Sequence, residues 1–158
     1  MSNLPRFIHL RTHTEYSLLE GAIPLKKLLK DCAAKGYPAV AVTDTDNMFA
    51  ALEFSVLAAG SGIQPILGCQ ISLAYDPPAP GEKLRLPAPV VLLAQSERGY
   101  MNLMKLNSCL YLPKDRPVPQ VTVDELEQYS EGLICLSGGA EGAVGKLIQT
   151  NQMPKARA

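Results

Sequence analysis

The sequence has no excess of charge of either sign: 15 Lys and Arg residues balance 15 Asp and Glu residues, and the formal net charge is zero. A domain that binds nucleic acid mainly through phosphates carries a basic excess. We therefore expect no tight nucleic-acid binding by this chain alone. The sequence also has no run of about 18 apolar residues, and its first residues, MSNLPRF, lack an apolar signal core. These absences predict neither a membrane span nor an export signal.

Cysteine pairs of the CxxC type are also absent. The four cysteines are far apart in apolar surroundings: Cys32, Cys69, Cys109 and Cys135. This pattern favours reduced, mostly buried thiols of a cytoplasmic protein over a disulfide framework. Histidine is scarce, and both copies, His9 and His13, lie in the stretch HLRTHTEYSLLEG. This stretch raises the question of whether it forms a metal site or the remnant of one.

A length of 158 residues allows one domain with a real core, and we expect a single domain over 1–158. Strand-like segments alternate with helix-like segments. The expected strands are 6–10, 38–44, 63–75, 90–95 and 132–139. The expected helices are 23–36, 47–62, 97–112, 122–130 and 140–152. The expected loops are 76–89, a hairpin or exposed loop, and 113–120, with a weak tail at 153–158. Alternation of this kind indicates parallel βα units.

Two helices carry further signals. In the segment 23–36 the lysines 26, 27 and 30 lie opposite an apolar stripe, which favours a solvated face over a phosphate-binding patch. In the segment 122–130, Thr122 and Glu125 have the spacing of a capping box.

In parallel βα folds the chemistry gathers at the carboxyl ends of the strands. The polar residues expected around this one mouth are His9, Arg11, Asp44, Thr45, Gln70, Gln95 and 137–139. A hydrolytic metal site needs several His, Asp, Glu or Cys ligands to converge. The chain offers His9, Glu20 and Asp44, with His13 nearby. The other side chains expected there are poor ligands: Arg11, Thr45 and Gln70.

These residue types alone argue against a multinuclear metal site, while leaving open one metal ion at His9 and Asp44. Without a metal, His9 is a core histidine satisfied by its neighbours, and His13 is a surface or capping residue. Glu20 and Asp44 would then be carboxylates at a low-dielectric mouth, where an unpaired charge is expensive. We expect Arg11 to contact one of them as the replacement positive charge.

Several segments together resemble a known family: FIHLRTHTEYSLLEGA, LKDCAAKGYPAVAVTDTDNMFAALEF, GIQPILGCQISL, VVLLAQSERGYMNLMKLNS and GLICLSGG. They are similar, in order, to the N-terminal PHP (polymerase and histidinol phosphatase) domain of bacterial DNA polymerase III alpha subunits, over about 6–146. The resemblance implies an α/β fold, a distorted βα barrel with metals at the carboxyl strand ends, truncated in this chain. It also implies a fragment of a larger polypeptide whose polymerase domains are absent here.

The resemblance implies specific ligand losses. His9 matches the first histidine of a His-x-His motif, Arg11 replaces the second, and Glu20 takes the acidic place. Asp44 is retained as a ligand residue, whereas Thr45 replaces a ligand histidine and Gln70 a ligand glutamate. Two further ligand positions become Pro89 and Gly139. These eight residues form a predicted vestigial metal pocket, with no catalytic or cofactor-binding residue. The Zn, Mn or Mg ions of the family are expected to be lost.

The predicted function is a metal-free scaffold that supports the polymerase core and binds the proofreading exonuclease subunit. The parent is then a DNA-directed DNA polymerase, a nucleotidyltransferase of chromosome replication, and this fragment alone is inactive. The alternative is a metal-dependent 3′–5′ exonuclease or phosphoesterase using the same mouth. A free-standing histidinol phosphatase is disfavoured by the polymerase-branch motifs. Because barrel-closing strands are expected to be missing, the segment 132–137 is predicted to keep an unpaired edge and to promote self-association.

Overall fold

The computed structural model describes residues 7–76, 85–112 and 116–157. Its strands are β1 (Ala39–Val42), β2 (Gln64–Ala74), β3 (Ala88–Ala94), β4 (Val121–Thr122) and β5 (Leu133–Leu136). Its helices are α1 (Leu25–Ala34), α2 (Ala51–Gly60), α3 (Glu97–Tyr111), α4 (Val123–Gln128), the 3-10 turn η1 (Gly139–Glu141), α5 (Ala143–Gln149) and α6 (Met153–Arg157). The α/β fold class predicted from the sequence is confirmed.

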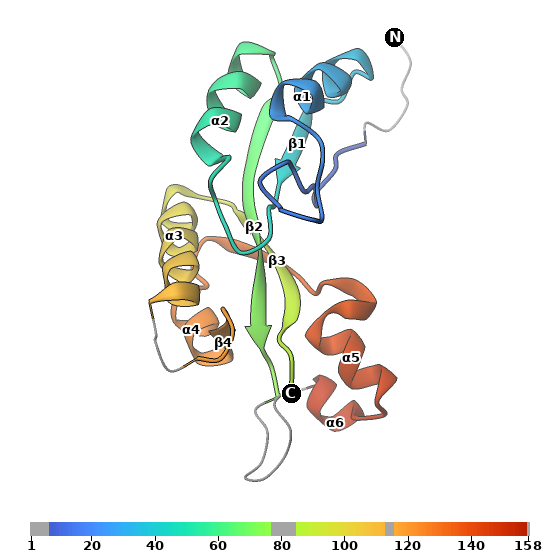
Figure 1. Ribbon diagram of the computed structural model, residues 1–158, viewed down its shortest axis with the longest axis vertical. Helices are drawn as coiled ribbons and strands as arrows, with labels where there is room; N and C mark the ends of the chain where they lie inside the picture. The colour runs from blue at the N-terminus through green and yellow to red at the C-terminus, as the bar shows by residue number, and fades with distance from the viewer. Residues whose placement is uncertain (1–6, 77–84, 113–115, 158) are drawn as a thin grey trace.

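Strand β2 organises the molecule and runs along its long axis (Figure 1). Its first part pairs in parallel with β1, and its second part pairs antiparallel with β3. Strand β4 adds a short parallel pairing at the end of β2, and β5 pairs antiparallel with β3. Helices α1 and α2 lie around β1 and the upper part of β2, whereas α3 and α4 flank the lower part on one side and α5 and α6 on the other (Figure 1).

The parallel pairing indicated by the alternation of strands and helices does not extend to β3. This strand is the next one after β2 and pairs antiparallel with it, as the hairpin expected over 76–89 allows. The end of β3 therefore points away from the mouth of β1. Gln95, expected at that mouth, instead donates its backbone N–H to the carbonyl of Gly132. The mouth is thus built from the first two strands and the loops around them.

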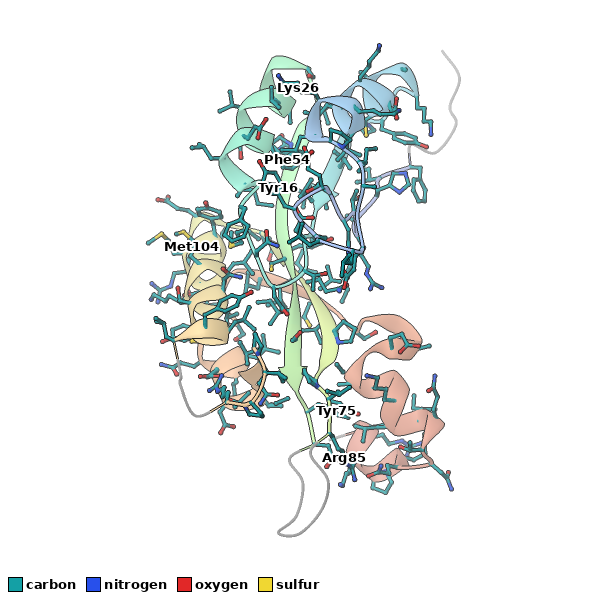
Figure 2. All side chains as sticks on the ribbon, in the orientation of Figure 1. Tyr16, Lys26, Phe54, Tyr75, Arg85 and Met104 are labelled. Carbon is teal, nitrogen blue, oxygen red and sulfur yellow. The ribbon has the colours of Figure 1, made fainter. Side chains whose placement is uncertain are left out.

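Two apolar clusters hold the helices on the sheet. The first packs the buried stripe of α1 and Phe54 of α2 on β1; its members are Leu25, Leu28, Leu29, Cys32, Val40, Val42, Ala50, Phe54, Ala58 and Ile63. The second packs Leu103, Leu106 and Leu110 of α3 against β2, β3 and Val121. Figure 2 shows Phe54 between α2 and the sheet. The lysines 26, 27 and 30 are exposed, as their solvated-face interpretation predicts.

Local contacts mark the ends of α1 and α4. Helix α1 begins after Pro24 and is followed by Gly36 at a φ of 67°, a left-handed conformation that glycine adopts without strain. Helix α4 has the predicted capping box: Thr122 Oγ1 accepts from the N–H of Glu125 at 3.2 Å, and Glu125 Oε2 accepts from the N–H of Thr122 at 2.8 Å.

Other local predictions need correction. The tail expected to be weak forms α6 over Met153–Arg157, where Lys155 Nζ lies 2.8 Å from Asp76 Oδ1. The expected strand 6–10 is reduced to a bridge between His9 and Val40, with residue 6 outside the described residues. All four thiols are free, but only Cys32 and Cys69 are buried, Cys109 is half-buried and Cys135 is exposed. The loops 76–89 and 113–120 lie partly outside the described residues. Within the described ranges, no helix is long and apolar enough to cross a bilayer.

Candidate vestigial metal pocket

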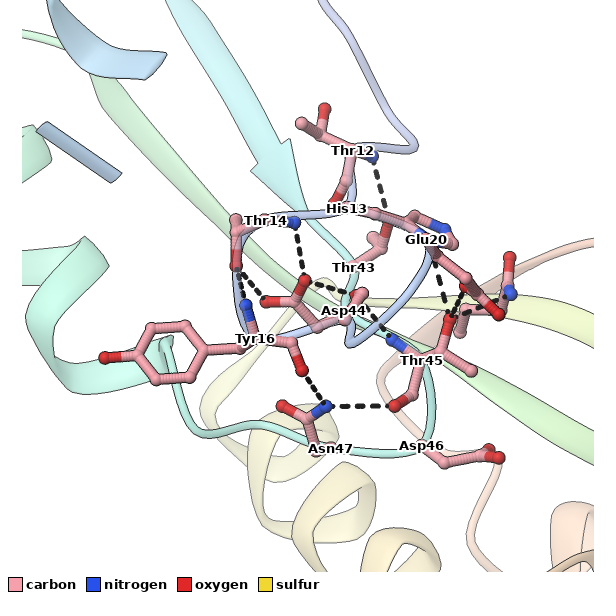
Figure 3. Close-up of polar contacts among 12 residues, drawn as sticks. Thr12, His13, Thr14, Tyr16, Glu20, Thr43, Asp44, Thr45, Asp46 and Asn47 are labelled. Atoms are coloured by element: carbon pink, nitrogen blue, oxygen red, sulfur yellow. Dashed lines mark hydrogen bonds and ion pairs between the residues drawn. The ribbon is translucent and has the colours of Figure 1, made fainter. Parts of the chain in front are cut away.

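Asp44, immediately after β1, is the most deeply enclosed carboxylate at the mouth, with 1% of its surface exposed. Its Oδ1 accepts hydrogen bonds from the N–H of Thr14 and from Ser17 Oγ, each at 2.6 Å, and its Oδ2 accepts one from Thr14 Oγ1 at 2.7 Å (Figure 3). Short hydrogen bonds to an ionised acceptor are among the stronger ones in proteins. Asp44 therefore anchors the segment 12–20 to the end of β1, and both of its oxygens are occupied by protein donors.

A second chain of polar contacts lies beside Asp44. His13 Nδ1 is 2.9 Å from Glu20 Oε2, and Thr45 Oγ1 donates to the same carboxylate oxygen at 2.5 Å. Gln70 Nε2 then donates to Thr45 Oγ1 at 3.2 Å. The backbones of Thr45 and Gln70 are bridged in parallel, which brings these side chains together. Thr45, a predicted replacement for a metal ligand, thus binds the carboxylate of Glu20, and Gln70, another such replacement, binds the hydroxyl of Thr45.

Two buried polar atoms of this chain have no partner among the described residues: His13 Nε2 and Gln70 Oε1. Cys69, the residue before Gln70, is fully buried, and this burial raises the pKa of its thiol far above the ordinary value. A thiol with a raised pKa is a poor nucleophile. Chemistry at this mouth would therefore rest on the imidazole and the carboxylates.

The structure corrects the expectations for His9 and Arg11. His9 is exposed, and its ring packs edge-on against Phe7 and Tyr37, at centroid distances of 4.7 and 5.4 Å. It is not a core histidine. Arg11 is exposed and makes no ion pair with Glu20 or Asp44 within the described part of the chain. Its charge is not needed there, because neutral hydroxyl and backbone donors already surround Asp44.

A hollow of about 430 Å³ connects some of the predicted residues. His9, Arg11, His13 and Glu20 line it together with Leu28, Asp31 and Cys32 of α1. His13 is only 17% exposed at its side chain, so its predicted surface position is also corrected.

The last two predicted positions lie further along the sheet. Pro89 is opposite Ser72 in the pairing of β2 with β3. Gly138, next to Gly139, packs on the carbonyl of Pro89, where a Cβ atom would come within 2.1 Å of that oxygen. Positions 89 and 139 are thus close in space, and neither side chain supplies a ligand atom.

Sequence reasoning missed several residues that build the mouth. Thr14 and Ser17 hold Asp44, and their hydroxyls spaced three residues apart after the strand were the available signal. Asp46 was missed as well. It has a φ of 55°, and its carboxylate accepts from the N–H and Oγ of Ser72, both at 2.8 Å. Burial raises the pKa of Asp46, and the hydrogen bonds from Ser72 oppose that rise.

The residues present do not fit a metal cluster. Over the described ranges, no three His, Cys, Asp or Glu side chains are grouped so that they would hold a metal ion. Three of the about four lone pairs of the Asp44 carboxylate already accept protein hydrogen bonds, and Glu20 is already shared by His13 and Thr45. The arrangement is a polar pocket in which protein groups bind both carboxylates, and it is suited to holding two loops in place.

An α/β fold with a polar pocket at the end of β1 defines a broad class, and sequence comparison narrows it. A family model for the PHP domain matches residues 9–158. The chain is 42% identical over 153 residues to DNA polymerase III subunit alpha of Caulobacter vibrioides, covering 96% of this chain and 13% of that one. It is 36% identical over 160 residues to the same subunit of Borreliella burgdorferi, covering 99% of this chain and 14% of that one.

The chain therefore belongs to the PHP family, and its relatives are DNA polymerase III alpha subunits. It spans only 13 to 14% of the length of these relatives. Among solved structures, an amidohydrolase from Chromobacterium violaceum is 22% identical, covering 65% of this chain and 32% of that chain, with a TM-score of 0.49.

Proposed function

We propose that this PHP domain is a metal-free scaffold module of a replicative DNA polymerase alpha subunit. The observation that carries the proposal is the occupied state of Asp44, whose two oxygens take three protein donors at 2.6 to 2.7 Å. A catalytic metal site keeps its ligands available and an open coordination position. Here the retained acid serves to hold loops, which is a structural task.

The rival function is a metal-dependent 3′–5′ exonuclease or phosphoesterase at the same mouth. The two proposals are separated by elemental analysis of the purified chain and a nuclease assay with added Mn²⁺ and Zn²⁺. The scaffold role predicts less than one bound metal ion per chain and no metal-stimulated nuclease rate. The variants His9→Ala and, as an exposed control on η1, Glu141→Ala are measured in parallel. Two or more stoichiometric metal ions, or a nuclease rate lost only in His9→Ala, would favour the enzyme.

The proposed partners are the rest of the polymerase alpha chain and the proofreading exonuclease subunit. The length of the relatives supports the first, since the chain spans 11 to 14% of alpha subunits of several bacteria. The expected polymerase activity belongs to that larger protein, and the chain alone is expected to polymerise no DNA. Biolayer interferometry with the exonuclease subunit of the same organism tests the second partner. No measurable binding would remove it from the proposal. The cytoplasmic location stays a prediction.

Self-association is a further expectation for the isolated chain. Within the described residues β5 pairs only with β3, so one of its edges is open, and Ile134 on this strand is 44% exposed. An open, uncharged edge strand recruits another chain by backbone pairing. Light scattering over a concentration series should show a dimer, weakened by Ile134→Lys. A strictly monomeric chain at all concentrations would contradict this expectation.

A further inference from the structure

A second hollow, of about 320 Å³, opens beside the vestigial metal pocket. It is bounded by the loop that precedes Gly21, by the loop between β1 and α2, and by the end of α3. We call it the acidic hollow, and its defining residues are Tyr16, Leu18, Glu20, Asp46, Phe49 and Tyr111. The structure binds these elements together, since the hydroxyl of Tyr111 donates to the carbonyl of Asp46 at 2.9 Å. Figure 3 shows Tyr16 and Asp46 near Asn47, whose amide donates to the carbonyl of Tyr16 at 3.1 Å.

Charge in this region has one sign. The segments 12–20 and 43–55, which supply most of the hollow, contain five carboxylates and neither Lys nor Arg. Two of these, Glu20 and Asp46, line the hollow itself. Among the described residues, the carboxylate of Asp46 makes no ion pair with a basic side chain. Its hydrogen-bond donors there are the N–H and Oγ of Ser72. A cation entering the hollow would therefore meet uncompensated negative charge.

The rim of the hollow is apolar and open. Leu18 is 83% exposed and Phe49 is 76% exposed. From Phe49 the apolar surface continues along α2 through Leu52, 78% exposed, and Val56, 65% exposed. Leu52 and Val56 are four residues apart on one face of α2, and Phe49 lies in the turn just before this helix. We call these three exposed residues the apolar stripe; exposed apolar surface of this kind is typical of interaction sites.

A buried amide oxygen next to the hollow also lacks a hydrogen-bond donor. Gln70 is 6% exposed, and its Nε2 binds Thr45 Oγ1, a group that lines the hollow. Its Oε1 has no donor among the described residues. Carboxylate oxygens and an unpaired amide oxygen are complementary to a group that only donates, such as a guanidinium.

We propose that the acidic hollow and the apolar stripe form a docking surface for a basic, apolar-faced segment of a partner protein. An Arg side chain of that segment enters the hollow toward Glu20 and Asp46 and stacks on the rings of Phe49 and Tyr111. Cation–π contact and charge-assisted hydrogen bonds then act on one group. The apolar residues flanking the Arg cover Leu18 and the apolar stripe. The negative charge of the surface excludes the phosphate backbone of DNA as its ligand.

This inference rests on the proposed scaffold function only because it requires a polypeptide partner. An experiment that contradicts the docking surface does not contradict the scaffold function. The probe is the peptide acetyl-Leu-Arg-Leu-amide, titrated into the isotopically labelled full chain while backbone amide shifts are recorded. Its matched control is the citrulline peptide, which has the same shape without the charge. We expect saturable shifts at the amides of Leu18, Phe49 and Tyr111, with the citrulline peptide at least about tenfold weaker. Raised salt should weaken the arginine peptide more than the citrulline peptide.

Two variants test the surface itself. Asp46→Asn should weaken the arginine peptide about tenfold or more while leaving the citrulline peptide unchanged. Because Asp46 also holds Ser72, the exposed Phe49→Ala provides a second variant that cannot act through that contact, and it should weaken both peptides. Ile148→Ala, on the distant α5 and 50% exposed, is the matched apolar control and should bind as the original chain does.

Equal binding of the two peptides, shifts that map outside the hollow, or binding unaffected by Phe49→Ala would overturn the proposal. The same amides shifting with a single-stranded DNA oligonucleotide would overturn it as well. So would shifts at Leu18 and Phe49 on raising the concentration of the chain alone, because a second copy would then occupy the surface. A metal-free chain that fails to bind the peptide leaves the scaffold function standing.

Discussion

Strand β2 carries two regions that are held in different ways. Beside the end of β1, loops are fixed by a carboxylate, Asp44, that collects protein donors. Further along, β2 and β3 are covered by α3 through an apolar cluster in which Leu92, Leu103 and Leu106 are fully buried. The first region depends on a few directional contacts around one charge. The second depends on many small contacts, none of which is decisive by itself.

Because of this difference, side chains in the first region can be substituted without disturbing the strands and helices that position them. In the first region the residues that hold Asp44 and Glu20 are hydroxyl, amide and imidazole groups of the chain itself. The strands and helices that position them need no alteration, because their cores lie elsewhere. The proposed loss of metal ligands at this mouth is therefore compatible with a stable fold, which is the condition for the proposed scaffold role.

The largest effect is expected where packing is lost. Leu103→Ala leaves a cavity under α3 and should destabilise the chain by about 2–5 kcal/mol. Urea unfolding followed by circular dichroism measures this change. Met101→Ala, on the same helix at a position 47% exposed, is the control and should cost far less. Equal effects of the two variants would mean that α3 is not held by its buried stripe.

A smaller but more local effect is expected at Asp44. Asp44→Asn removes the charge and turns one oxygen into a donor that faces donors, so about 1.5–3 kcal/mol of stability should be lost. Amide exchange should accelerate in the segment 12–20 and not under α3. Glu15→Gln, exposed in the same segment, controls for the loss of a charge alone. Exchange that rises uniformly through the chain would contradict the separation of the two regions.

One contribution to the acid dependence of stability should come from a third place, α4. The hydrogen bond from Arg116 lowers the pKa of Glu125 below its ordinary value of 4.5. A lowered folded-state pKa gives stability that is present above pH 4.5 and is lost as pH falls through the folded-state value. Glu125→Gln should cost about 0.5–1 kcal/mol at pH 7 and nothing once both states are protonated. The exposed Glu127→Gln is the control. An effect of Glu125→Gln that is independent of pH would refute this assignment.

Much of the architecture could be predicted from the sequence because its signals are local. Pro24, Gly36 and the spacing of Thr122 and Glu125 mark helix ends through contacts within a few residues. The direction of β3 and the partners of Asp44 depend on segments far apart in the chain, and residue types do not determine these. Thr45 and Gln70 were expected at the mouth and are there, because parallel β1 and β2 bring them together. Arg11 was misplaced because hydroxyl and backbone donors balance a buried carboxylate without a cation.

The smallest effect is expected at Arg11, and it tests that last point. An Arg held between Glu20 and Asp44 would stabilise the chain strongly, and its removal would cost about 3–5 kcal/mol if the pair were buried. The exposed Arg11 seen here predicts a change within about 0.5 kcal/mol for Arg11→Ala, as for other surface substitutions. Urea midpoints of the variant and the original chain, measured at low and high salt, decide between these values. A loss of several kcal/mol that salt reduces would mean that Arg11 does supply positive charge to Glu20 or Asp44, and that the hydroxyl donors around Asp44 are not sufficient.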